Sequence, residues 1–162
     1  MAKPDIQAAL DAVDMTYSEL IDIVDDTRRS IMEDCDVIIE DVSNNIQDMS
    51  NDRIRDTLMR LSLKSYYLAS IKDKSAFKAN LAETIRKEAY ARAFGNAVGT
   101  VAQKDGQALL DTSSQAVAEK IHDLMADLFK SSTDEIHRTI YFLKTVLMSR
   151  LSEAKLVSND VQ

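Results

Sequence analysis

Apolar or neutral side chains recur at steps of three or four residues through the first third of the chain. This spacing is the period of an α-helix, whereas a half-buried β-strand alternates every second residue. Pro4 suits the first turn of such a helix, because its missing amide hydrogen would have no partner there. The pattern predicts a helix over residues 4–48, with an inner face made of Ile6, Leu10, Val13, Tyr17, Leu20, Val24, Thr27, Ile31, Cys35, Ile38, Val42, Ile46 and Met49.

The length of this predicted helix leaves two interpretations open. A continuous helix over these residues would extend roughly 67 Å, at about 1.5 Å per residue. A compact domain of this size has a radius of gyration of only about 15 Å, so the helix does not fit inside one compact monomer. Either it breaks, near Arg28-Arg29-Ser30 or Asp34-Cys35-Asp36, or it projects and pairs with another chain as a coiled coil.

Two further helices are predicted after the polar segment Ser50-Asn51-Asp52, whose short side chains can cap a helix start. The first spans residues 51–72, and the second begins at Ser75 and ends near residue 93, before two glycines interrupt the pattern. Their apolar faces are expected to consist of Ile54, Leu58, Leu61, Ser65, Leu68 and Ile71 in the first helix and Phe77, Leu81, Ile85 and Ala89 in the second.

The C-terminal half predicts a turn at Lys104-Asp105-Gly106, followed by a pair of helices over residues 107–156. Thr112 with Gln115, and Ser132 with Glu135, have the spacing of a capping box, in which the two side chains bond each other's backbone amides. The first helix of the pair should therefore start near Thr112 and end near Lys130. The inner faces of the two helices should comprise Val117, Ile121, Leu124 and Leu128, then Ile136, Ile140, Leu143, Leu147, Leu151 and Ala154.

Three glycines and one proline in 162 residues leave little material for turns, and 45% apolar residues suffice for a core. The expected fold class is all-α: a bundle of five or six helices with a long N-terminal helix that could form a coiled coil. We expect one domain over residues 1–162. Its sectors would be a long acidic helix over 4–48, a basic helical pair over 51–93 and a C-terminal helical pair over 107–156.

Charge separates along the chain by sector. Residues 1–52 have a net charge of −11, residues 53–92 of +6 and residues 93–162 of −2, which together give the chain's net −7. An acidic helix followed by a basic pair predicts electrostatic complementarity, either within one chain or between subunits.

Two charged faces are candidate binding surfaces. The basic face would contact nucleic acid or another partner, with lysines and arginines on phosphates and tyrosine on bases, although a pI near 4.8 opposes attraction to a polyanion. The acidic face would bind a basic partner, or imitate a phosphate backbone as an inhibitor. The basic candidates are Arg53, Arg60, Lys64, Tyr67, Lys74, Lys78, Arg86, Lys87 and Arg92, and the acidic ones are Asp22, Asp25, Asp26, Glu33, Asp36, Glu40 and Asp41.

Signatures of catalysis are missing from the sequence. It has no GxxxxGK[ST], GxGxxG or GxSxG motif, and Cys35 continues an apolar stripe as a core residue would. Glu119 with His122, and Asp134 with His137, have the i, i+3 spacing found in di-iron bundles, but they are more typical of an ordinary helix surface. We expect no enzyme activity, no catalytic residues, no metal site and no cofactor.

The lone cysteine and the absence of a secretion signal indicate an intracellular, cytoplasmic protein, and interrupted apolar runs indicate a soluble one without membrane contact. The expected function is a non-enzymatic, oligomeric helical interaction protein, which binds copies of itself and another protein as an assembly subunit or small regulator. Its size would suit an accessory protein of a virus or mobile element. A nucleic-acid-binding module using residues 53–92 is the alternative, and an acidic mimic of nucleic acid is a further one.

Overall fold

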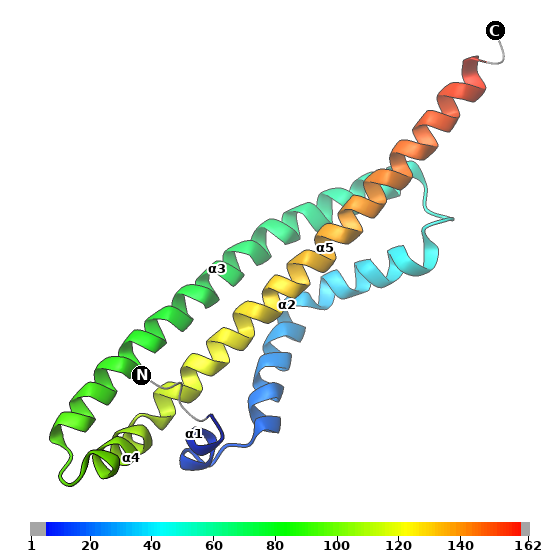
Figure 1. Cartoon of the computed structure of the whole chain (residues 1–162). Coiled ribbons are helices and arrows are strands. Elements are labelled where there is room, and N and C mark those ends of the chain that lie inside the picture. The colour runs from blue at the N-terminus through cyan, green and yellow to red at the C-terminus, as the bar shows by residue number, and fades with distance from the viewer. Residues whose placement is uncertain (1–5, 160–162) are drawn as a thin grey trace. The chain divides into compact units, whose positions relative to one another are not determined.

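The computed structural model describes residues 6–159 and folds this range into five α-helices without a strand. The helices are α1 (Ile6–Ala12), α2 (Tyr17–Asn45), α3 (Asn51–Asn96), α4 (Val101–Asp111) and α5 (Ser113–Asn159), as labelled in Figure 1. The predicted all-α helical bundle is therefore confirmed, whereas several predicted helix boundaries are wrong.

The predicted helix over 4–48 breaks, at a place that differs from both expected positions. α1 ends at Ala12 and α2 begins at Tyr17, and α2 then runs unbroken through Arg28-Arg29-Ser30 and Asp34-Cys35-Asp36. Asp14 adopts a positive φ of 54°, which a helix cannot contain.

A capping box then starts α2. The Glu19 amide donates to Thr16 Oγ1 at 3.2 Å, and the Thr16 amide donates to Glu19 Oε2 at 2.7 Å. The Thr16 amide, and the Thr16 hydroxyl that donates to the same oxygen at 2.8 Å, hold the pKa of Glu19 below its usual value, the amide most strongly.

The predicted helical pairs over 51–93 and 107–156 are each largely one helix. α3 is 46 residues long and continues past Ser75, which is buried on the inner side of the helix and does not cap a new one. α5 continues for 47 residues through Lys130 and Ser132, so the Ser132–Glu135 spacing is not a capping box. The neighbouring Thr133 donates its hydroxyl to the Phe129 carbonyl one turn back, which leaves the helix intact.

The predicted turn at Lys104-Asp105-Gly106 lies inside α4. This helix starts earlier, at a capping box in which Thr100 and Gln103 bond each other's backbone amides. Gly99 just before it has a φ of 127°, and a Cβ there would lie 2.6 Å from Gln103 Oε1, so glycine is required.

Thr112 caps the C-terminal end of α4, and α5 begins at the next residue, Ser113, where the Ala116 amide donates to the Thr112 carbonyl at 3.0 Å. The predicted helix start near Thr112 is therefore confirmed, but not its capping box. The Thr112 hydroxyl donates to the Ala108 carbonyl, and so the predicted box with Gln115 does not form.

The chain divides into two compact units, Met1–Arg29 with Ile71–Leu128 and Ser30–Ser70 with Phe129–Gln162. We call these unit 1 and unit 2. Helices α2, α3 and α5 each contribute one segment to each unit, while α1 and α4 belong to unit 1.

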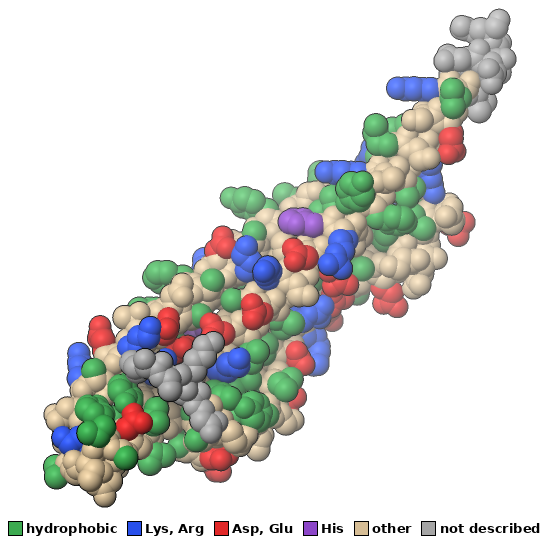
Figure 2. All heavy atoms as spheres, in the orientation of Figure 1, with side chains coloured by type: hydrophobic (Ala, Val, Ile, Leu, Met, Phe, Trp, Pro, Cys, Tyr) green, Lys and Arg blue, Asp and Glu red, His purple; other side chains and the backbone are tan. Residues whose placement is uncertain are grey.

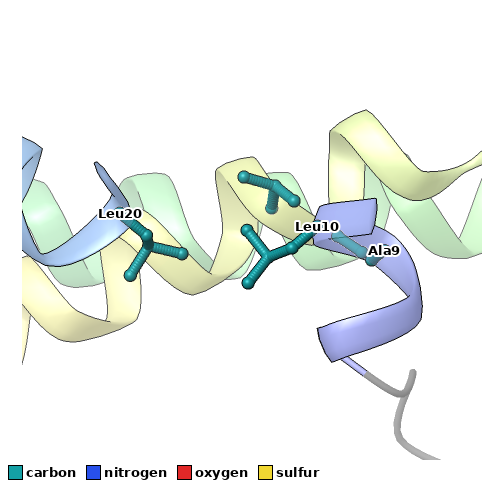
Figure 3. Close-up of a cluster of buried hydrophobic side chains, with 5 residues drawn as sticks. Ala9, Leu10 and Leu20 are labelled. Atoms are coloured by element: carbon teal, nitrogen blue, oxygen red, sulfur yellow. The ribbon is translucent and has the colours of Figure 1, made fainter. Parts of the chain in front are cut away.

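The core of unit 1 joins α1, the start of α2 and the start of α5. Figure 3 shows the side chains of Leu10 and Leu20 beside α5, with Ala9 next to Leu10. Ala116 and Val117 of α5 complete this buried cluster, and partly buried residues pack around it: Ile6, Val13, Met15, Ile121 and Leu124. Burial of these side chains stabilises the fold by roughly 1.5–3 kcal/mol for each large one.

Unit 2 contains three antiparallel helical segments. Lys64 of α3 bonds Asp34 of α2, and Arg53 of α3 bonds Asp41 of α2. Later residues of α3 therefore lie beside earlier residues of α2, so the two helices are antiparallel. α3 and α5 are antiparallel in the same way, because Ser65 contacts His137 near one end and Arg150 reaches the segment before α3 at the other. Most of the buried side chains between them lie on the predicted stripes: Cys35, Ile38 and Val42; Ile54, Leu61 and Leu68; Ile136, Ile140 and Leu143. Met32 and Phe129 are also buried, and each lies one residue beyond a predicted position, Ile31 and Leu128.

Arg150 orders the connection between α2 and α3. Its guanidinium donates to the Ile46 carbonyl at 2.9 Å, to the Gln47 carbonyl at 3.3 Å and to the Met49 carbonyl. Carbonyls that follow a helix end have no intrahelical donor, so a cationic side chain here satisfies them and stabilises the turn.

Candidate functional site

The outer side of α3 in unit 2 is apolar. Met59, Leu63, Tyr66 and Tyr67 are all more than half exposed, and Tyr66 keeps 81% of its surface. They lie three or four residues apart, on the face opposite the buried Leu61 and its neighbours. A helix of a monomeric bundle ordinarily presents polar residues outward, so this face has the composition of a surface that another molecule covers.

In unit 1, α3 is turned so that its larger apolar residues face outward. Phe77 is 67% exposed, Leu81 48% and Ile85 49%, although the sequence pattern places them on the inner face. The inner face instead carries Ser75, Ala79 and Arg86, and this exchange corrects the predicted apolar face of this segment. On the face drawn in Figure 2, too, hydrophobic side chains reach the surface among acidic and basic ones.

The orientation of α3 in unit 1 has a specific cause, which is an ion pair with α5. Arg86 is only 5% exposed, and its Nε donates to Glu119 Oε2 at 2.6 Å. A buried guanidinium requires a nearby carboxylate, and so this ion pair fixes which face of α3 turns inward. Arg86 therefore lies inside unit 1, and its predicted position on the exposed basic face is wrong.

Two other members of the candidate basic face pair with the acidic helix. Lys64 Nζ lies 2.7 Å from Asp34 Oδ2, and Arg53 lies 2.8 Å from Asp41 Oδ2. The hydrogen bond from Lys64 lowers the pKa of Asp34 and raises that of Lys64, while the hydrogen bond from Asn45 is the main cause that lowers the pKa of Asp41. The predicted complementarity between the sectors is confirmed within unit 2 by these two pairs.

The remaining basic candidates are exposed. Lys87 pairs with Glu83 at 2.7 Å and Arg92 approaches Glu88 at 3.9 Å, both as neighbours along α3. Arg60, Lys74 and Lys78 have no ion-pair partner within the described residues, and Tyr67 is 60% exposed. These last side chains are the part of the basic face that is available to another molecule.

The acidic candidates lie mainly on the outer side of α2. Asp22, Asp25, Asp26, Glu33 and Glu40 are exposed, whereas Asp36 and Asp41 are partly buried. In unit 1 the start of α2 forms a shallow hollow of about 380 Å³, lined by Asp14, Met15, Glu19, Asp22, Ile23 and Asp26. We call this the acidic hollow, because four of its six lining residues are carboxylates.

A second hollow, of about 280 Å³, lies beside the buried Arg86–Glu119 pair. Glu83, Lys120 and Asp123 also line it, so charges of both signs meet there. Partial burial raises the pKa of Asp123, and the negative charge of Glu119 raises it further. Because Glu119 already binds Arg86, two of the charges that line this hollow neutralise each other, which leaves fewer of them for a ligand.

The two pairs with the spacing of metal ligands are Glu119 with His122 and Asp134 with His137, and one member of each pair is bonded to another residue. Glu119 binds Arg86, and the Nε2 atom of His137 is hydrogen-bonded to Ser65 Oγ at 2.6 Å. In the described range no group of three or more His, Cys, Asp or Glu side chains is arranged to hold a metal ion.

The Ser65–His137 contact resembles a nucleophile with its base, but its surroundings are structural. Ser65 is 7% exposed in the middle of α3, where the neighbouring amides bond within the helix. An oxyanion would find no free backbone donor there, so the contact is better explained as a hydrogen bond between packed helices.

Two helix starts had a signal in the sequence that the predicted boundaries did not take into account. Thr16-Tyr17-Ser18-Glu19 has the capping-box spacing, and so does Thr100 with Gln103. The Arg86–Glu119 and Ser65–His137 contacts join residues far apart in the chain, and no local pattern marks them.

Comparison of the chain with protein-family models, with curated proteins and with solved structures finds no significant match. None of the described helices has an apolar stretch long enough to cross a bilayer.

Proposed function

We propose that this chain is a non-enzymatic helical protein–protein interaction protein, which acts inside the cell as an oligomeric assembly subunit or a small regulator. The observation that carries the proposal is the outward face of α3 in unit 1, where Phe77, Leu81 and Ile85 are exposed. The same helix buries Ser75 and Ala79. A partner that covers such a face would gain roughly 1–2 kcal/mol for each large side chain removed from water.

The position of these residues supports a binding role over chance exposure. Single exposed apolar residues are common on any protein, but three in one row on a helix form a continuous patch. The row follows the i, i+4, i+8 spacing by which helices engage a groove or another helix.

Affinity capture from the native host tests the proposal. Tagged wild-type chain should retain a defined set of proteins, and Phe77→Asp with Leu81→Asp should reduce that set about tenfold, as expected when the centre of an interface is lost. Val98→Asp with Val101→Asp is the matched control, because Val98 and Val101 are 95% and 74% exposed elsewhere in unit 1. Equal capture by wild type and both variants would refute the proposal.

Nucleic-acid binding is the second candidate, supported by the exposed Arg60, Tyr67, Lys74 and Lys78. Its support is weaker, since Arg53 and Lys64 already pair with aspartates and Arg86 is buried. Fluorescence anisotropy with a labelled single-stranded oligonucleotide decides between them. Arg60→Glu with Lys78→Glu should abolish a salt-sensitive binding signal if this function is right. Mimicry of nucleic acid by the exposed carboxylates of α2 would instead require a basic protein in the captured set.

A further inference from the structure

The outer face of α3 in unit 1 has basic side chains beside its apolar ones. Lys74 and Lys78 are exposed, and each lies three or four residues from Phe77 or Leu81, so all four share one side of the helix. Neither lysine has an ion-pair partner within the described residues. We call Lys74, Phe77, Lys78, Leu81 and Ile85 the basic ridge.

The acidic hollow of unit 1 has the opposite composition. Asp14, Glu19, Asp22 and Asp26 line it together with Met15 and Ile23, so carboxylates and apolar side chains meet there. Asp14 and Asp22 have no side-chain partner within the described range, and Asp26 bonds only the exposed Arg29 on its own helix. The hollow therefore offers both negative charge and apolar contact to a ligand that carries lysines around an apolar side chain.

We propose that the basic ridge of one copy docks into the acidic hollow of a second copy of this chain. Lys74 and Lys78 would lie against the carboxylates, and Phe77 would lie on Met15 and Ile23. This inference rests on the proposed function and names the partner for the same face of α3.

Charge complementarity is what selects a second copy over other occupants. The chain is acidic, with a net charge of −7, and its positive charge is concentrated in residues 53–92. A membrane of anionic lipid would attract the ridge but repel the acidic outer side of α2. A second copy supplies carboxylates and apolar surface together.

The contact would join two different surfaces, so each copy carries one ridge and one hollow. Such a heterologous contact either closes on itself or adds further copies, and in both cases the mass exceeds that of one chain. Light scattering should therefore give at least twice 18.1 kDa for the wild-type chain at high concentration.

Charge reversal provides the decisive experiment, because the two surfaces can be changed separately. Lys74→Glu with Lys78→Glu inverts the ridge, and Asp22→Lys with Asp26→Lys reverses the charge of two of the four carboxylates in the hollow, which brings their net charge from −4 to zero. Each variant alone should scatter as an 18.1 kDa monomer. An equimolar mixture of the two should assemble again, because the reversed charges of one variant meet the reversed charges of the other, and the chain carrying all four substitutions should assemble by itself.

The control is Lys130→Glu with Lys144→Glu, which changes the net charge equally at exposed positions of α5 in unit 2. This variant should assemble like the wild type. Circular dichroism of every variant should match the wild-type helical spectrum, because all substituted side chains are exposed.

Several results would overturn the inference. They are a monomeric wild-type chain at every concentration, inverted variants that assemble like the wild type, or a mixture that stays monomeric. Co-sedimentation of a monomeric wild type with phosphatidylserine vesicles, lost on inverting the ridge, would assign the ridge to a lipid surface instead. A monomeric wild type whose captured proteins still disappear with Phe77→Asp and Leu81→Asp would overturn the second copy as partner while leaving the proposed function intact.

Discussion

The buried ion pair between Arg86 and Glu119 allows the most direct test of how α3 is oriented in unit 1. The Arg86 side chain is 6% exposed and that of Glu119 is 18% exposed, with 2.6 Å between their bonded atoms. Removing one member of a buried pair leaves the other charge without compensation, which typically costs about 3–5 kcal/mol. The fold should therefore depend strongly on either partner when the other is present.

The difference in exposure sets the size of each single effect. Glu119→Gln leaves a nearly inaccessible guanidinium and should lower the free energy of unfolding by about 3 kcal/mol. Arg86→Met leaves a carboxylate that water reaches in part, so about 2 kcal/mol is expected. The double variant has no stranded charge and should also lose only about 2 kcal/mol, which implies a coupling energy of about 3 kcal/mol between the two side chains.

Urea denaturation followed by circular dichroism measures all three variants in a double-mutant cycle. For a chain of this length the Glu119→Gln variant should melt roughly 6–12 °C below the wild type. Lys87→Met with Glu83→Gln is the matched control, since that pair has a similar distance of 2.7 Å but side chains 51% and 42% exposed. Its coupling should be about 0.5 kcal/mol or less. Equal coupling in the buried and exposed pairs would refute the argument that burial gives the Arg86–Glu119 contact its weight.

Three further predictions concern single positions. The pKa of Asp123 is raised in the fold, because burial and then Glu119 disfavour its charged form. The folded state therefore binds this proton more tightly than the unfolded chain, and stability falls as the pH rises from the pKa of the unfolded chain toward that of the folded one. Asp123→Asn should raise the melting temperature at pH 7 but not at pH 3, and an equal effect at the two pH values would contradict this. Thr100→Ala removes one half of the capping box of α4 and should cost about 1 kcal/mol, measured by urea denaturation, whereas Thr100→Ser should cost much less. Arg150→Ala leaves three carbonyls between α2 and α3 without their donor and should cost about 2 kcal/mol; hydrogen exchange should then speed up in residues 46–50, and unchanged exchange there would argue against a role in ordering this connection.

Much of the core could be predicted from the sequence because a helical period places apolar residues in the interior whatever the neighbouring helix is. Leu20, Cys35 and Val42 in α2, and Leu61 and Leu143 in the other long helices, were all expected on inner faces and are buried. The spacing of these residues follows from helix geometry alone, so it needs no knowledge of the partner helix.

Helix ends were harder to predict, because the same short motif can be used or ignored. Thr16 with Glu19 forms a capping box, while Ser132 with Glu135 has the same spacing inside an uninterrupted helix. A capping box satisfies only amides that a helix end leaves unpaired. Where packing on both sides keeps the helix continuous, as around the buried Phe129 and Ile136, those amides are already bonded and the motif has no function.

What the sequence alone determined is the helical class, most of the inner faces of the N-terminal and unit 2 helices, and the separation of charge into sectors, since each of these depends on neighbours along the chain. Tyr17 and Ala154 are exceptions, because both were expected on inner faces and are exposed. The tertiary structure decided which charges are paired, and which side of α3 faces outward in unit 1. Arg86 shows the reason: its partner Glu119 lies 33 residues away, and only their meeting offsets the cost of burying a guanidinium. Once that pair holds the inner face, Phe77, Leu81 and Ile85 are left on the surface, where a helical period by itself would have buried them.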